Sequence, residues 1–236
     1  MGRAIALLFA REGARVAVNY GHSRDAAEEV VARIRSDGGT AIPIAADVSD
    51  EKQVRAMVGR VEQEFGGLDF LVNNAGWSTI IPHAQLEALT DEIWDRTLNT
   101  NLRGAFYCTR ASVPLLKQRA GAAIVNIASV AAQTGSGSSI VYAASKGAMV
   151  TMTKSLARAL APAIRVNAVA PGAVHTRFAN WPNTMFEQAA QVTPIERIAS
   201  VEEIASAVLF LCAEATSVTG EIMTVDGGLT QLGRTR

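Results

Sequence analysis

The chain has 236 residues, nearly half of them apolar, and its 22 basic and 22 acidic side chains leave a formal net charge of zero. Such a balance lacks the basic excess that nucleic-acid binding requires, and the scattered cysteines (Cys108, Cys212) and three histidines show no metal-ligand spacing. No apolar run approaches the roughly 18 residues that span a bilayer. The apolar stretch Ala4–Ala10 continues into a helix-then-strand pattern, so we expect a cytoplasmic protein without a targeting segment.

Strands and helices alternate from one end of the chain to the other. The first predicted elements are a helix over Arg3–Arg11, a strand over Arg15–Asn19, a helix over Arg24–Ser36, a strand over Ala41–Ala45, a helix over Asp50–Phe65 and a strand over Leu68–Val72. The later ones are helices over Thr90–Leu98 and Arg103–Gln118, a strand over Ala123–Ile127, a helix over Val141–Leu160, a strand over Ile164–Val169, a helix over Val201–Ala213 and a strand over Glu221–Val225.

This alternation predicts an α/β fold, a doubly wound and mostly parallel sheet of Rossmann type with helices on both faces. We find no repeat, low-complexity stretch or linker, so we expect one domain over residues 1–236. The segment Pro171–Ser200 is predicted to be irregular, and a connection of that length inside a compact domain is usually functional.

Polar motifs follow the predicted strands, at the edge of a parallel sheet where ligands bind. In chain order these motifs are Asn73-Asn74-Ala75-Gly76, Asn101-Leu102-Arg103-Gly104, Asn126-Ile127-Ala128-Ser129, Tyr142-Ala143-Ala144-Ser145-Lys146, Pro171-Gly172 with Thr176, and Asp226-Gly227-Gly228. Each motif alone is an ordinary loop, turn or exposed pair. Their joint order and spacing carry the information.

In that order and spacing, the motifs resemble the short-chain dehydrogenase/reductase family over essentially the whole chain. The likeness is greatest to its 3-oxoacyl-carrier-protein reductase and glucose dehydrogenase branch. The resemblance implies an enzyme that moves a hydride between a nicotinamide dinucleotide and a carbonyl or alcohol.

Four residues form the expected catalytic group. Tyr142 and Lys146 lie four residues apart on one helical face, where the ammonium favours the phenolate and lowers the tyrosine pKa. Ser129 can hydrogen-bond the substrate oxygen. By resemblance, Lys146 also holds the nicotinamide ribose and Asn101 anchors a water that links Lys146 to solvent. The alternative for Tyr142 and Lys146 is an exposed helical pair.

The resemblance also implies a set of dinucleotide contacts. Asp47 and Val48 match the adenine-contacting pair, although Asp47 could equally cap the following helix. The remaining contacts carried over by the resemblance are Asn74, Ala75 and Gly76 near the adenosine ribose, Pro171 and Gly172, and Thr176 at the nicotinamide carboxamide.

The end of the first predicted strand bears on the choice of dinucleotide. An acid there would favour NAD(H), but the chain has Asn19-Tyr20 and no acid before Asp25. Ser23 and Arg24 could meet a 2′-phosphate, which favours NADP(H) with NAD(H) still open. Arg24 could instead be a solvated first-turn residue.

The chain departs from the family pattern at its start. The family begins with a strand and a turn resembling Thr-Gly-x-x-x-Gly-x-Gly, of which only the final glycine, Gly2, is present. Three hypotheses follow: a natural start further upstream, a sheet that closes up or borrows a strand, or weak pyrophosphate binding at the helix start Gly2-Arg3. The departure also supports a competing function, that of a non-catalytic or cofactor-impaired relative acting as a binding or scaffold protein.

The expected substrate is a small-molecule carbonyl or alcohol, with residues 173–200 as a lid and Phe178 and Trp181 in its lining. An apolar lining favours a free ketone or small acyl thioester over a sugar. Docking of a carrier protein would need basic residues, for which Lys117, Arg119 and Arg177 are candidates. Relatives are usually tetramers, so we expect a homotetramer.

Overall fold

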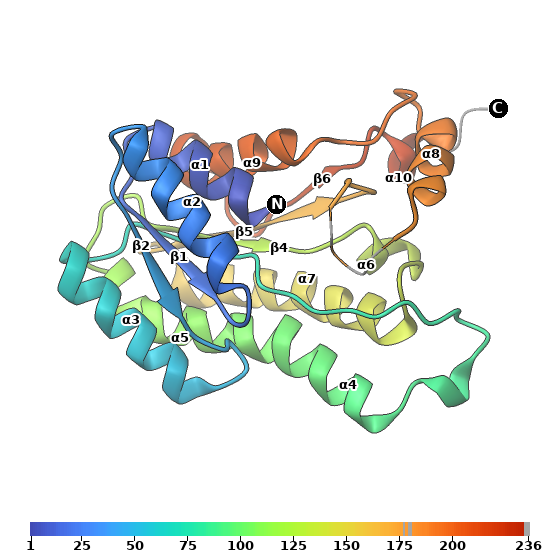
Figure 1. The fold of residues 1–236 in the computed structure, drawn as a ribbon, viewed down its shortest axis with the longest axis horizontal. Helices are drawn as coiled ribbons and strands as arrows, with labels where there is room; N and C mark the ends of the chain where they lie inside the picture. Colours follow the sequence, from blue (N-terminus) through green and yellow to red (C-terminus); the bar gives the residue numbers. More distant parts are fainter. Residues whose placement is uncertain (177, 179–180, 234–236) are drawn as a thin grey trace.

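The computed structural model describes residues 1–176, 178 and 181–233, and its strands all pair in parallel (Figure 1). The strands are β1 (Val16–Tyr20), β2 (Ala41–Ala45), β3 (Phe70–Asn73), β4 (Ala123–Ile127), β5 (Arg165–Pro171) and β6 (Ile222–Val225). Each lies within two residues of its predicted position. The parallel α/β architecture predicted from the alternation is therefore confirmed.

The helices also follow the predicted order. They are α1 (Gly2–Arg11), α2 (Arg24–Ser36), α3 (Glu51–Phe65), α4 (Asp91–Leu98), α5 (Gly104–Leu116), α6 (Ala131–Thr134), α7 (Ile140–Leu160), α8 (Asn183–Val192), α9 (Val201–Leu209) and α10 (Leu229–Leu232). A 3₁₀ turn covers Leu86–Ala88, and π-helical turns cover Asn99–Arg103 and Phe210–Glu214. Asp50 caps α3 through bonds from the Lys52 and Gln53 amides.

The prediction of an irregular segment over Pro171–Ser200 was wrong in its centre, where α8 forms. Pro182 and Pro194 suggested a loop, but Pro182 stands just before the helix, where its fixed φ and missing N–H cost nothing. The apolar residues Met185, Phe186, Ala189 and Val192 recur at helical spacing along α8.

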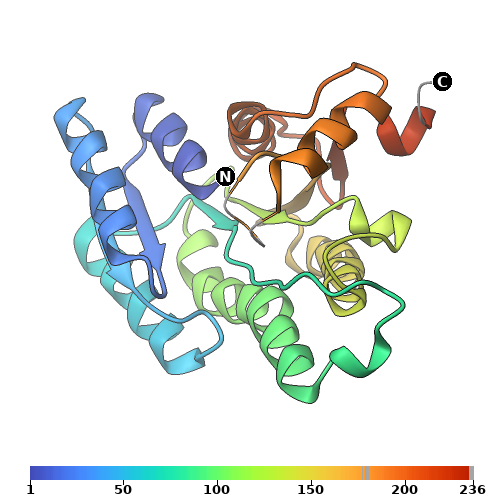
Figure 2. The same ribbon diagram turned by 45° about the vertical axis from the view of Figure 1, so that its right-hand side comes forward.

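Helices cover both faces of the strands (Figures 1 and 2). Helices α1, α2 and α9 lie on one face, and α3, α4, α5 and α7 lie on the other. Strand β4 is buried along its whole length, and β5 is buried from Val166 onward. Apolar runs of this kind are expected of parallel strands covered on both faces.

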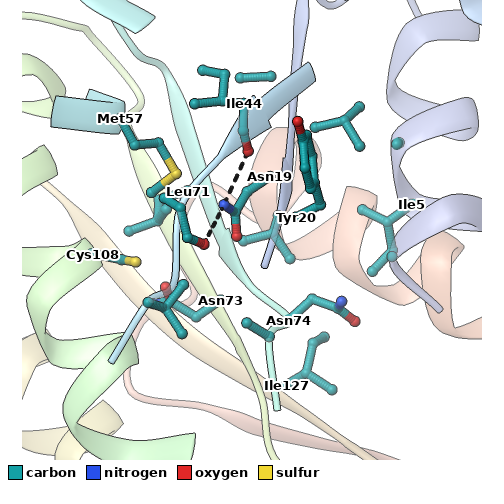
Figure 3. Close-up of a pocket in the computed structure, with 18 of the residues that line it drawn as sticks. Ile5, Asn19, Tyr20, Ile44, Met57, Leu71, Asn73, Asn74, Cys108 and Ile127 are labelled. Atoms are coloured by element: carbon teal, nitrogen blue, oxygen red, sulfur yellow. Dashed lines mark hydrogen bonds between the residues drawn. The ribbon is translucent and has the colours of Figure 1, made fainter. Parts of the chain in front are cut away.

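The strands form two sheets rather than the single sheet that was predicted. One sheet has the order β1-β2 and the other the order β3-β4-β5-β6, so β1 and β3 each lack a partner on one edge. A cavity of about 1230 Å³ lies between those edges, and every residue of β1 and β3 lines it. We call the part of this cavity between β1 and β3 the strand slot. Figure 3 shows Asn19, Tyr20 and Leu71 among the residues that line it.

Helix α1 covers the strand slot from one face. Phe9 of α1 stacks edge-on against Phe70 of β3, with ring centroids 6.2 Å apart. Ile5 and Phe9 join the same buried cluster as Ile204 and Val208 of α9. The hypothesis that the sheet closes up is therefore not what the structure shows, because α1 holds the two edges apart.

A capping box begins α9, the helix that supports α1. The Ser200 hydroxyl accepts from the Glu203 amide, and the Glu203 carboxylate accepts from the Ser200 amide while pairing with Arg197 at 2.7 Å.

We predict that Ser200→Ala lowers the free energy of unfolding by about 1 kcal/mol, because the Glu203 amide loses its acceptor. For a chain of this size that corresponds to a melting temperature lower by about 2–4 °C. Differential scanning calorimetry measures it, with Ser206→Ala as control, since the exposed Ser206 hydroxyl only bonds back to the Glu202 carbonyl. Equal melting temperatures for the two variants would contradict the prediction.

Candidate active site

Three of the four predicted catalytic residues meet at the carboxyl end of β4. Ser129 follows β4 directly, and Tyr142 and Lys146 stand one turn apart at the start of α7. The start of α7 is set by Ser139, whose hydroxyl accepts from the Tyr142 amide. This cap fixes where α7 begins. The four-residue spacing then puts Tyr142 and Lys146 on the same side of the helix.

The phenol of Tyr142 is buried beside Ser129. Burial raises the pKa of Tyr142, so the expectation that Lys146 lowers it was wrong, and a hydrogen bond with the Ser129 side chain opposes the rise. The ring of Phe178 lies 5.8 Å from the Tyr142 ring, centroid to centroid. The phenol is therefore protonated at neutral pH.

Lys146 is buried in the structure, so the alternative of an exposed pair does not hold. Its Nζ donates to the Ile127 carbonyl at 2.6 Å and lies 5.8 Å from the centre of the Tyr142 ring. Desolvation lowers the pKa of Lys146 from 10.5 to about 8.

Asn101 lies in the π-helical turn between α4 and α5. Its Oδ1 accepts from the Trp77 amide at 2.7 Å, and its Nδ2 donates to the Trp77 carbonyl and to the Ser145 hydroxyl. Because both N–H groups of this amide are engaged, its side chain offers no donor to a relay water. The structure instead shows Asn101 tying the Trp77 loop to α7.

Sequence reasoning missed a buried polar ladder that connects the strands to α7. Asn73 of β3 donates to the Asn126 carbonyl oxygen Oδ1 at 2.8 Å, and Asn126 of β4 donates to Thr153 Oγ1 at 2.9 Å. Thr153 lies eleven residues after Tyr142 on the same side of α7. The ladder sets the register of α7 against β4 and so places Tyr142 near Ser129. Asparagines inside otherwise apolar strands were the available signal.

Most of the expected dinucleotide contacts line the large cavity that includes the strand slot. Those lining it are Gly2, Asn19, Tyr20, Ser23, Asp47, Val48, Asn74, Ala75, Gly76, Tyr142, Lys146 and Thr176. The Asp47 carboxylate accepts from the amide and hydroxyl of Ser49, so it shapes its own turn, while Asp50 caps α3. Pro171 and Gly172 line a neighbouring cavity instead.

Two residues expected to choose between dinucleotides are otherwise engaged. The Asn19 amide donates to the Ile44 and Ala46 carbonyls, the first bond being drawn in Figure 3. Arg24 is paired with Glu28 at 2.7 Å and is absent from the cavity lining. The expectation that Arg24 faces the cofactor site was wrong for this structure, because the i,i+4 pair on α2 holds it.

The pyrophosphate end of the cavity is the least complete. A Cβ at Gly2 would lie 2.7 Å from Asn74 Nδ2, so any other residue would require the Asn74 side chain to move. The Met1 amine at this point is half-buried, which lowers its pKa, and Glu202 opposes that effect. The described residues thus fit the ribose and nicotinamide end of a dinucleotide better than its phosphates.

A second cavity of about 560 Å³ adjoins the catalytic group. Ser129 and Tyr142 lie on its wall with Phe178 and Trp181, the two expected substrate residues. Of the basic residues considered for carrier docking, Arg119 bonds to the Gly66 carbonyl before β3, at the opposite end of the strands, and Arg177 lies outside the described residues. Among the described residues, no cluster suits a metal ion, and no helix is long and apolar enough to cross a bilayer.

We predict that Lys146→Met stabilises the fold at neutral pH. A pKa lowered from 10.5 to about 8 corresponds to a penalty of about 3 kcal/mol for keeping the charge buried. Because the folded pKa lies below the unfolded one, the wild type regains stability as the pH rises from 8 towards 10.5, and the advantage of the variant shrinks there.

Melting temperatures at pH 7 and pH 10 measure this difference. The matched control is Lys154→Met, an exposed lysine on the same helix. An equal shift for both variants at both pH values would contradict the prediction.

Comparison with known proteins places these features among related chains. Residues 1–230 match the family model described as enoyl-(acyl carrier protein) reductase. A 3-oxoacyl-[acyl-carrier-protein] reductase of Staphylococcus aureus is 40% identical over 233 residues, which is 97% of this chain and 93% of the relative.

Solved structures extend the comparison. A Burkholderia xenovorans protein assigned to the short-chain dehydrogenases/reductases superposes with a TM-score of 0.92 at 39% identity, covering 97% of this chain and 93% of that one. A short-chain dehydrogenase/reductase of Brucella melitensis, described as a glucose/ribitol dehydrogenase, gives a TM-score of 0.86 at 36% identity, covering 97% and 91%.

Proposed function

Because this chain belongs to the short-chain dehydrogenase/reductase family, whose members are oxidoreductases acting on CH–OH and C=O groups, we propose that it reduces a ketone with Tyr142 as the proton donor. The observation that carries the proposal is the placement of Tyr142 on the walls of both cavities, beside buried Lys146 in the larger one and beside Ser129 in the smaller one.

Each of the three side chains has a role in this proposal. Ser129 orients the carbonyl oxygen towards the phenol through a hydrogen bond. Tyr142 gives its proton to that oxygen, and its raised pKa keeps the proton available at neutral pH. Lys146 stabilises the phenolate that remains. Asn101, through its bonds to Trp77 and Ser145, acts as a positioning residue.

A nicotinamide dinucleotide supplies or accepts the hydride when it is bound. Lys146 and Tyr142 would hold its ribose, Thr176 its carboxamide and Asp47 its adenine. We propose a preference for NADP(H), because Asn19 presents no carboxylate to repel a 2′-phosphate. Ser23 and Arg24 could meet that phosphate only if Arg24 leaves Glu28.

The strand slot favours one competing function. A chain that binds the dinucleotide poorly would be a non-catalytic member of the family, and it would act as a binding or scaffold protein. Turnover of any ketone with either dinucleotide would exclude this alternative.

Calorimetric titration of NADPH and then NADH into this chain is the experiment that tests the proposal, followed by a panel of ketones. We expect saturable binding that favours NADPH, with ketone-dependent oxidation of NADPH. A folded protein that binds neither dinucleotide and turns over no ketone would overturn the proposal.

We also propose a homotetramer assembled through α5 and α7. Phe106 on α5 is 38% exposed, and a neighbouring subunit packed on α5 would cover it. Light scattering on the purified chain measures the assembly.

A further inference from the structure

The residues that line the 560 Å³ cavity beside the catalytic group indicate the class of substrate. This inference rests on the proposed ketone reduction. The volume of the cavity lies in the range of small-molecule pockets. One end is formed by Ser129 and Tyr142, and the other by α8 and the loop before α7. We call it the substrate cavity.

Charged side chains are absent from the described lining of the substrate cavity. Its apolar members include Val130, Ala131, Phe178, Trp181, Met185 and Phe186. The one charged group among the described lining residues is the Met1 amine, which the Glu202 carboxylate faces. A carboxylate buried here would lose its hydration without gaining a cationic side chain.

Several hydroxyls on the wall are already bonded. Thr134 donates to the Val130 carbonyl at 3.1 Å, Thr230 donates to the Asp226 carboxylate at 2.6 Å, and Ser138 pairs with Ser78. A polyhydroxylated substrate needs partners for each buried hydroxyl. This wall therefore suits a sugar poorly.

Helix α8 leaves its apolar side largely uncovered in the part of the chain that the structure describes. None of its residues is buried, although Met185, Phe186, Ala189 and Val192 all line the substrate cavity. It is tied to the chain before it by the His175–Phe186 ring contact at 4.7 Å and the His175–Asn183 contact at 3.4 Å. An apolar ligand in the cavity would bury this side of the helix.

We propose that the substrate is an uncharged ketone with an alkyl or aryl substituent, and that this substituent packs against the apolar side of α8. The ketone oxygen lies at Ser129 and Tyr142. The substituent packs against Trp181, Met185 and Phe186. Carboxylate-bearing ketones and sugars are discriminated against because the described wall offers no cationic side chain and several of its hydroxyls are already bonded.

The test compares two ketones with the same reacting group. One is a methyl ketone with an unbranched hexyl chain, and the other is the same ketone with a terminal carboxylate on that chain. We expect kcat/KM to be at least about a hundredfold higher for the neutral ketone. Equal kcat/KM values would overturn the proposal.

A charge placed on the wall provides the matched variant. Phe186→Arg puts a cation into the substrate cavity and is expected to reduce the ratio of the two kcat/KM values at least about tenfold. Gln188→Arg puts the same charge on an exposed position of α8 that does not line the cavity. That control should leave the ratio within about twofold. An unchanged ratio in Phe186→Arg would count against the assignment of this wall.

A second readout separates this proposal from the proposed function. If no ketone is turned over, hydride transfer fails, and the cavity is tested without dinucleotide by quenching of tryptophan fluorescence. The probes are the secondary alcohols of the two ketones, and Trp181→Phe identifies the signal from this cavity. Saturable quenching by the neutral alcohol alone supports the proposal, whereas equal binding of both alcohols, or of neither, overturns it.

Discussion

Tyr142→Phe is expected to lower kcat/KM for ketone reduction by about 10²–10⁴-fold, the usual contribution of a positioned general acid. The substitution removes only the hydroxyl oxygen. Phe178 still packs against the ring, and α7 keeps its cap because Ser139 bonds to the main-chain amide of residue 142. The loss should therefore be one of proton transfer and not of folding.

Two measurements accompany that result. The dissociation constant for NADPH should rise by no more than about tenfold, because Tyr142 loses one ribose contact worth about 0.5–1.5 kcal/mol while the Lys146 side chain keeps its bond to the Ile127 carbonyl. Tyr107→Phe on α5 serves as the matched control, since Tyr107 stands outside both cavities and contacts Arg110. Turnover by Tyr142→Phe at the wild-type rate would show that another group donates the proton.

A strand and glycine-rich turn fused ahead of Met1 are expected to stabilise the fold and tighten dinucleotide binding. The free edges of β1 and β3 face one cavity, where their amides and carbonyls lack strand partners. A parallel strand of five apolar residues would pair with both edges and would end, at its carboxyl end, near the start of α1. The turn would add backbone amides for the pyrophosphate.

The size of both effects can be bounded. Two added amide bonds to phosphate at about 1.5 kcal/mol each lower the dissociation constant for NADPH by about a hundredfold. A net gain of about 3 kcal/mol from strand pairing raises the melting temperature by about 6–12 °C in a chain of this size. Calorimetry measures both quantities.

The control for this fusion is a glycine- and serine-rich extension of equal length, which cannot fill an apolar slot. Ser112 also lines this cavity, and its buried hydroxyl has no hydrogen-bond partner among the described residues. Comparable affinity and stability for the original chain, the fusion and the control would show that the slot needs no strand.

Much of the fold followed from local patterns in the sequence. Apolar spacing together with caps such as Asp50 placed the helices, because those signals act within one turn of the chain. The motifs after the strands placed Ser129, Tyr142 and Lys146 at one sheet edge, because the carboxyl ends of parallel strands meet there. The apolar spacing in α8 is equally local, but the helix stands between Pro182 and Pro194, and prolines at such spacing also predict a loop.

The tertiary structure alone decided how those side chains are engaged. Asn101 bonds to Trp77, 24 residues earlier, and Asn19 bonds to Ile44, 25 residues later. The burial of Lys146, which sets its pKa, depends on the elements packed around α7. The sequence also left open whether the sheet closes between β1 and β3. The packing of α1 on α9 and β3 keeps it open. All these contacts join residues that are distant in the sequence, so they exist only once the chain has folded.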